Sequence, residues 1–258
     1  MRRVFAVYKR ELNLFFRSNI AYAVAFGLLL FLGVLYSSSV STFSAVNQGG
    51  FSQQVFTADD ILLTNISTLT FLLFIIAPLL TMRLLSEETR EGTLEVLMTL
   101  PMSDWHFVVG KFLAVWTLYT VILLLTLLHA FLLTLVGTLD MGLLFTAYLG
   151  AWLYGGATLA VALIWSALTE DQIVAAFLGA ASILVLLLAE RVAELVASQP
   201  AISGAADFVR ELSFPAHYDQ TMLGGIIRAE DVLYFVLLMI AALFITTLLV
   251  SSRRWRAS

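Results

Sequence analysis

Three glutamates in the polar stretch 82–112 have the spacing of one helix face. Glu87, Glu91 and Glu95 follow one another at intervals of four residues, so a helix would present them as one acidic stripe. Arg83 lies four residues before Glu87, a spacing that lets opposite charges pair on a helix surface. The stretch is therefore either a docking surface for a partner protein or a solvated helical loop held by such pairs.

Gly92 and Pro101 divide this polar stretch. Glycine costs a helix about 1 kcal/mol relative to alanine, so we expect either a close backbone approach or a helix break at Gly92. Pro101 should stop the helix, because the residue before a proline is biased away from helical geometry. Asp104 can then begin a second helix that leads into the next apolar segment.

Residues suited to catalysis are scarce. The chain has no cysteine, no G-x-x-x-x-G-K-[ST] phosphate loop, and neither H-E-x-x-H nor G-x-S-x-G. Only His129 lies inside an apolar run. A proton relay there would need a carboxylate at similar depth, and we find none, so we favour an imidazole hydrogen-bonded between helices. We expect no enzymatic activity, no metal and no cofactor.

The composition is that of a membrane protein. Of the 258 residues, 60% are hydrophobic and 12% are charged, against about 25% charged in soluble domains. The apolar residues form runs long enough to cross a bilayer, with no room left for a soluble domain. We predict an all-α membrane protein with six transmembrane helices in one domain, 1–258. The predicted spans are 20–39, 61–82, 111–136, 143–168, 173–189 and 231–250.

Three further segments need an interpretation. Residues 1–19 are basic and amphipathic, which indicates a helix in the membrane interface, with a plain basic leader as the alternative. Residues 20–39 are not read as a cleaved signal peptide, because cleavage would leave five spans. We expect a polar loop at residues 40–60. For residues 190–230 we expect either short re-entrant helices near the lipid headgroups or a solvated loop.

Small residues and one proline are notable within the spans. Gly150, Gly155 and Gly156 lie in the fourth span, where they would let neighbouring helices approach closely. Pro78 lies near the end of the second span, where we expect it to kink the helix.

The distribution of basic residues predicts the orientation. Six spans place both termini, the 83–110 loop and the 169–172 turn on one side. Eleven Lys and Arg residues lie on that side and three on the other, which by the positive-inside rule predicts cytoplasmic termini in an inner or plasma membrane. The eleven are Arg2, Arg3, Lys9, Arg10, Arg17, Arg83, Arg90, Lys111, Arg253, Arg254 and Arg256; the three are Arg191, Arg210 and Arg228.

The polar stretch resembles a known family. MRLLSEETREGTLEVLMTLPMSDWHFVVGKF is similar to the intracellular loop of ABC-2 type transport permeases, whose pattern is E-x-x-x-G-T-L-E-x-L-x-x-x-P-x-S ahead of a Gly-Lys pair. YKRELNLFFRSNIAY resembles the connecting helix of that family. YLGAWLYGGATLAVALIWSALTEDQIVAAF and MLGGIIRAEDVLYFV look like the subgroup that includes gliding-associated permeases. The resemblance covers nearly the whole chain.

This resemblance implies the permease subunit of an ABC exporter. It implies a separate ATP-binding subunit, a second permease copy or paralogue as homo- or heterodimer partner, contact with membrane lipid, and no nucleic acid. In such assemblies, the cytoplasmic loop between the second and third spans, here 83–110, carries a coupling helix that rests in a groove of the ATPase. The residues implied in that contact are Glu87, Glu88, Arg90, Glu91, Gly92, Thr93, Glu95 and Pro101.

Two other functions are weighed against this one. A membrane anchor or assembly component could use a partner ATPase for mechanical work rather than solute transport. An ion-coupled secondary transporter would need midplane charges or broken helices in matched halves, and the spans have neither. The transported substrate is not readable from these residues.

Overall fold

The protein is a bundle of long helices with short helices at one side. The computed structural model describes residues 2–49, 57–92, 103–198 and 203–254, and these ranges contain no strand. Six of their helices are long and apolar enough to span a membrane, which confirms the predicted class. They are α2 (Asn19–Gly49), α3 (Ala58–Arg90), α5 (Asp104–Leu133), α6 (Met141–Leu168), α7 (Gln172–Ala197) and α10 (Ala229–Arg254).

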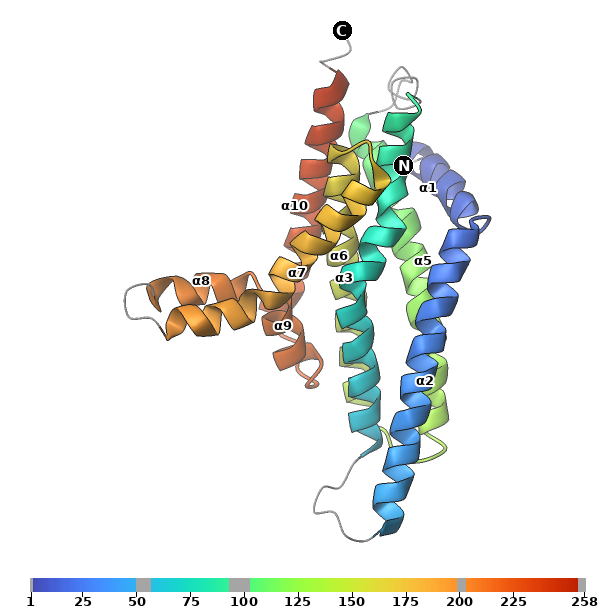
Figure 1. The fold of residues 1–258 in the computed structure, drawn as a ribbon, viewed down its shortest axis with the longest axis vertical. Helices are drawn as coiled ribbons and strands as arrows, with labels where there is room; N and C mark the ends of the chain where they lie inside the picture. Colours follow the sequence, from blue (N-terminus) through green and yellow to red (C-terminus); the bar gives the residue numbers. More distant parts are fainter. Residues whose placement is uncertain (1, 50–56, 93–102, 199–202, 255–258) are drawn as a thin grey trace.

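Helix α6 is the central element of the bundle. It packs against α3, α5, α7 and α10, and most of its residues are buried (Figure 1). The N-terminal helix α1 (Arg2–Phe15) packs against α5 near the end of the bundle where α3 ends and α10 finishes. By contrast, α2, α7 and α10 bury only a minority of their residues, as expected of helices that face lipid or another subunit.

Residues 40–49 and 58–60 of the predicted 40–60 loop are helical, so the expectation was wrong for these residues, and 50–56 lie outside the described residues. Helix α2 continues ten residues beyond the predicted span, and hydroxyls there find acceptors within the helix, as Ser44 does at the Val40 carbonyl, 3.0 Å away. The next helix begins after Thr57, which forms a capping box with Asp60. Polar side chains that bond to their own helix do not end it.

Helix α3 also extends past its predicted span. It continues through residues 83–90, which were expected to belong to the loop, with Pro78 inside it. The Pro78 ring packs against α7 at Gly179, where a Cβ would lie 3.2 Å from the Pro78 Cβ. Helix α5 begins at Asp104, as predicted, so residues 104–110 are helical as well.

The glycines of α6 receive bulky side chains from its neighbours, which confirms the predicted close approach. A Cβ at Gly150 would lie 2.7 Å from the Tyr218 ring, and one at Gly155 would overlap the Tyr119 ring. The Tyr119 hydroxyl crosses this gap to donate to the carbonyl of Ala151 at 2.7 Å. Small residues therefore let α5 and the segment before α10 pack directly onto the α6 backbone.

The end of α7 and several short helices occupy most of the described part of the predicted 190–230 segment. Helix α7 continues to residue 197 and carries an exposed ion pair between Arg191 and Glu194 at 3.3 Å. Helices α8 (Ala206–Glu211) and α9 (Phe214–His217) follow, and α8 lies beside the projecting end of α7 (Figure 1). A re-entrant position of these helices in the membrane stays a prediction.

The packing at Gly155 generates the first testable prediction. Gly155→Ala should lower the thermal unfolding midpoint of the purified protein, because the added methyl overpacks against Tyr119, at a cost of about 1–3 kcal/mol. Gly27→Ala is the matched control: a Cβ there meets nothing within 4 Å, and alanine favours a helix interior by about 0.5–1 kcal/mol. Equal midpoints for the two variants would contradict this packing.

Candidate functional site

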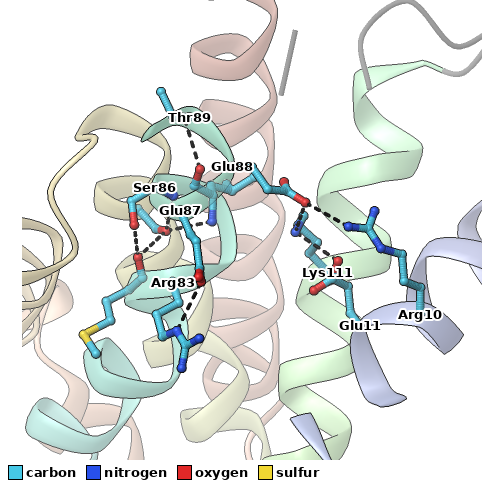
Figure 2. A network of polar contacts seen from close by, with 11 residues as sticks. Arg10, Glu11, Arg83, Ser86, Glu87, Glu88, Thr89 and Lys111 are labelled. Carbon is cyan, nitrogen blue, oxygen red and sulfur yellow. Dashed lines mark hydrogen bonds and ion pairs between the residues drawn. The ribbon is translucent and has the colours of Figure 1, made fainter. Parts of the chain in front are cut away.

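The end of α3 carries charges on two different sides of the helix (Figure 2). Arg83 Nε donates to Glu87 Oε2 at 3.2 Å, and both side chains are about one-third exposed. This confirms the pairing expected from their spacing. Arg90 and Glu91 are exposed. These four residues, Arg83, Glu87, Arg90 and Glu91, are called the exposed α3 end below.

Gly92 breaks the helix instead of making a close approach. Its φ is +68°, a left-handed conformation that favours glycine, and a Cβ there would meet nothing within 4 Å. The backbone N–H of Gly92 donates to the carbonyl of Thr89 at 3.2 Å, which closes the last turn. Helix α3 therefore ends at Arg90 with Glu91 as its cap, whereas Glu95, the third glutamate of the predicted stripe, lies outside the described residues.

Part of the predicted contact lies outside the described residues. Glu87, Arg90, Glu91 and Gly92 are brought together at the end of α3. Three further predicted positions lie outside the described residues. These are Thr93, Glu95 and Pro101.

Glu88 points away from the exposed α3 end and into the bundle. Its side chain is 11% exposed, and its Oε1 lies 3.0 Å from Lys111 Nζ and 3.8 Å from an Arg10 guanidinium nitrogen. Lys111 also pairs with Glu11 Oε1 at 3.1 Å (Figure 2). The four residues Arg10, Glu11, Glu88 and Lys111 form what is called the Lys111 cluster. Glu88 is therefore placed differently from the other glutamates predicted to contact a partner.

The Lys111 cluster joins three helices through buried charges. Arg10 and Glu11 come from α1, Glu88 from α3 and Lys111 from α5, and the last three are at most 8% exposed. A buried ammonium is strongly unfavourable unless it is paired and hydrogen-bonded. The two negative and two positive charges of the cluster compensate each other. Because the charges come from α1, α3 and α5, Lys111 can be buried only when these three helices are packed together.

The residue before Lys111 explains how α1 comes close enough. A Cβ at Gly110 would lie 2.8 Å from the Cβ of Val7, so α1 rests against the backbone of α5 at this point. About two turns further along α5, the hydroxyls of Tyr8 and Thr117 are 3.2 Å apart. The Gly-Lys pair thus supplies both the space for α1 and the charge that holds it.

Ser166 fastens the same part of α3 to the central helix. Its Oγ accepts hydrogen bonds from the backbone N–H groups of Leu85 at 3.0 Å and Ser86 at 3.3 Å. Its hydroxyl donates to the carbonyl of Met82 at 3.0 Å, and the Ser86 hydroxyl bonds to the same carbonyl. A side chain of α6 is therefore inserted into the backbone hydrogen-bond ladder of α3, directly before the exposed α3 end.

Sequence reasoning missed the partners of Glu88. Lys111 was counted only as a cytoplasmic charge, and Glu11 was given no role. One signal was present: Glu11 is the sole acid in the basic segment 1–19. A lone carboxylate among cations, together with a lysine at the start of an apolar run, would have indicated a buried pair.

His129 does not make the hydrogen bond that we expected. Its ring stacks on Tyr36 of α2, with ring centres 4.9 Å apart, and its Nδ1 is buried without a hydrogen-bond partner in the described part of the chain. The expected hydrogen bond is therefore replaced by ring packing between α2 and α5. No carboxylate is in contact with it there, and a proton relay remains unsupported.

His217 makes a separate polar contact between α9 and α10. Its Nδ1 lies 2.9 Å from the carboxylate of Asp231, and its Nε2 lies 3.1 Å from the carbonyl of Glu211. The ring also stacks on Tyr234, with centres 4.0 Å apart. This contact ties the short helices to the start of α10. Across the described ranges, no group of three or more acids and histidines could hold a metal ion.

Comparison with known families decides the class. A family model described as an ABC-2 family transporter protein matches residues 6–253. The chain belongs to the ABC-2 transporter family. It is accordingly an integral, multi-pass membrane permease. Permeases of this family are membrane components and not ATPases themselves; they generally work with an ATP-binding subunit and often dimerise. A comparison with curated proteins gives no match.

The Lys111 cluster generates the second prediction. Lys111→Met should destabilise the permease, because it leaves two buried acids facing Arg10 alone; losing one partner of a buried pair costs about 3–5 kcal/mol. Thermal unfolding of the purified protein measures this. Lys9→Met, the same substitution at an exposed position of α1, should change stability by less than about 0.5 kcal/mol.

A second comparison separates the charge from the shape of the side chain. The triple change Lys111→Met, Glu11→Gln and Glu88→Gln removes the excess negative charge and should recover part of the lost stability. If the triple variant loses, relative to the unchanged permease, the sum of the losses measured for the three single variants, the residues do not act as one cluster.

Proposed function

We propose that this permease is the membrane subunit of an ABC exporter and that the exposed α3 end binds a separate ATP-binding subunit. The observation that supports this best is the division of charges at the end of α3. Glu88 belongs to the Lys111 cluster, whereas Arg90 and Glu91 are exposed beside a break at Gly92 and Glu87 is about one-third exposed. Charged side chains held on a fixed helix end suit specific docking of a protein of complementary charge.

The orientation needed for this contact is also part of the proposal. Helices α3 and α10 end, and α5 begins, at the end of the bundle near α1 (Figure 1). The eleven basic residues assigned to that side favour the cytoplasm of an inner or plasma membrane. A cytosolic ATPase would then meet the exposed α3 end directly.

Force at this surface would be carried into the membrane by α3. The helix is 33 residues long, about 50 Å at 1.5 Å per residue, so its exposed end and its membrane part are one element. Ser166 ties it to α6, and the Lys111 cluster ties it to α1 and α5. Closure of the ATPase subunits would thereby shift α3 together with three neighbouring helices.

A second permease copy or a paralogue would complete the pathway. Helices α2, α7 and α10 expose large apolar side chains, including Phe26, Phe177 and Leu237. These surfaces can face lipid or another permease, and we propose that part of them pairs with a second subunit. Helix α6 is already enclosed by α3, α5, α7 and α10, so the surface that remains for a second subunit is the outer one.

Charge reversal tests the docking surface. In a permease tagged and purified from its native membrane, Glu87→Lys with Glu91→Lys should reduce the co-purified ATP-binding subunit at least about tenfold, since like charges across an interface cost several kcal/mol. Adding Glu95→Lys should deepen the loss. The matched control is Glu194→Lys with Asp207→Lys, two exposed acids that already form only surface pairs.

Two results would decide against parts of this proposal. Unchanged co-purification and unchanged ATP hydrolysis in the reversed variant would remove the exposed α3 end as the docking surface. Normal, permease-dependent ATP hydrolysis without solute movement in reconstituted vesicles would favour the anchor or assembly role over export.

A further inference from the structure

His217 and Asp231 form a buried contact where the short helices meet α10. The two residues are 8% and 2% exposed, and His217 Nδ1 lies 2.9 Å from Asp231 Oδ1. The other ring nitrogen, Nε2, lies 3.1 Å from the carbonyl oxygen of Glu211 and 3.7 Å from the carboxylate of the same residue. Both ring nitrogens therefore face an oxygen at hydrogen-bond distance, one from a carboxylate and one from a carbonyl.

This geometry requires a proton that a neutral imidazole does not have. A neutral ring carries hydrogen on one nitrogen and a lone pair on the other, whereas a carbonyl or an ionised carboxylate can only accept. In either neutral tautomer, one of the two contacts would set a lone pair against a lone pair. Both contacts are hydrogen bonds only when the His217–Asp231 pair holds one further proton, as an imidazolium beside a carboxylate or as a neutral ring beside a carboxylic acid.

The carboxylate of Asp231 has no second donor that could replace this proton. Its Oδ2 is buried without a hydrogen-bond partner in the part of the chain that the structure describes. Arg228, three residues earlier, pairs with Glu230 at 3.5 Å. A buried carboxylate without a proton or a paired cation is costly. Loss of the proton therefore weakens the contact twice, because the ring loses a hydrogen bond and the acid loses its compensation.

The other ionisable groups near α9 do not take the place of the imidazolium. The two arginines on the packed helices pair with acids of their own helices, Arg191 with Glu194 at 3.3 Å and Arg210 with Asp207 at 3.5 Å. The remaining groups on the elements around His217 are acids and tyrosines. They are Glu190 of α7, Glu211 of α8, Tyr218 and Asp219 of the π-helical turn η2 (Tyr218–Met222), Tyr154 of α6, and Glu230, Asp231 and Tyr234 of α10.

The contact lies at the centre of the connection between the short helices and α10. Tyr234 stacks on the His217 ring, with centres 4.0 Å apart, and its hydroxyl donates to the carbonyl of Leu212 at 2.8 Å. Phe214, which begins α9, is fully buried against the rings of Tyr154 and Phe235. These contacts position the imidazole, and histidine is the side chain whose charge ordinarily changes near neutral pH.

We propose that His217 and Asp231 form a proton-binding site and that the bound proton holds α9 on α10. As the pH rises, loss of the proton releases the short helices from the start of α10, so the contact acts as a pH-dependent latch. In the orientation proposed for this permease, the junction lies on the side of the membrane opposite the ATPase, and the pH outside the cytoplasm sets the latch. The site goes beyond the proposed function and does not depend on it.

Hydrogen–deuterium exchange of the purified permease between about pH 5 and about pH 9 tests the latch. Asp231→Asn is the informative variant, because the asparagine amide can donate to Nδ1 of a neutral ring whose Nε2–H still donates to Glu211. At the acid end, the backbone amides of residues 214–222 should exchange at similar rates in the two proteins. At the alkaline end, the unchanged permease should exchange at least about tenfold faster than Asp231→Asn, the effect of one lost hydrogen bond to a charged group.

A comparison of two proteins at the same pH cancels the chemical pH dependence of exchange. Faster exchange in Asp231→Asn at every pH, or the same ratio of rates at both ends, would overturn the proton site, because Asp231 would then act as a fixed charge. His217→Gln gives an independent reading, since it removes the titrating ring. Its rates for residues 214–222, divided by the chemical rate of each amide, should be equal at both ends, and a surviving alkaline increase would also overturn the site.

Two control variants keep the His217–Asp231 pair and alter comparable groups elsewhere. His106→Gln changes a histidine of α5, and Asp219→Asn changes an exposed acid two residues after His217. Both should retain the alkaline increase in exchange of the unchanged permease. Loss of that increase in Asp219→Asn would assign the proton to Asp219 and overturn the site. All of these measurements use the permease alone, so failure of the latch and failure of ATPase docking are distinguishable.

Discussion

The buried ammonium of Lys111 is the constraint on which the arrangement of this end of the permease depends. Its charge is tolerable inside the protein because Glu11 and Glu88 reach it from two other helices at 3.1 and 3.0 Å. These acids are 100 and 23 positions away in sequence, so the pairings fix α1 and α3 against α5. Helix α1 is therefore a packed member of the bundle as well as a candidate interfacial helix.

This constraint gives neighbouring glutamates of α3 different roles. Successive residues of a helix point about 100° apart, so Glu87 and Glu88 cannot face the same side. Glu88 pairs with the buried Lys111, and Glu87 therefore lies on the outer side of the helix, where it pairs with Arg83. The acidic character of this segment thus serves two needs: one carboxylate closes the bundle, and the next remains available to a partner outside it.

The sequence predicted the features that depend on local pattern. The six apolar runs, the helix start at Asp104 and the close packing at Gly155 follow from composition and spacing, and the structure has all of them. The buried place of Glu88 could not be predicted in this way, because its partners Glu11 and Lys111 come from other helices. The lengths of α2, α3 and α7 were underestimated because the predicted spans stopped where the apolar runs stop, whereas the helices continue through polar residues beyond them.

The connections of α3 restrict how its exposed end can move. Displacing it away from α6 would break three hydrogen bonds to Ser166, and displacing it away from α5 would separate Glu88 from Lys111. Both losses leave buried polar groups without partners, which is costly. On the side of α1, Glu88 also lies 3.8 Å from an Arg10 guanidinium nitrogen, so polar contacts connect this end of α3 to α6, α5 and α1.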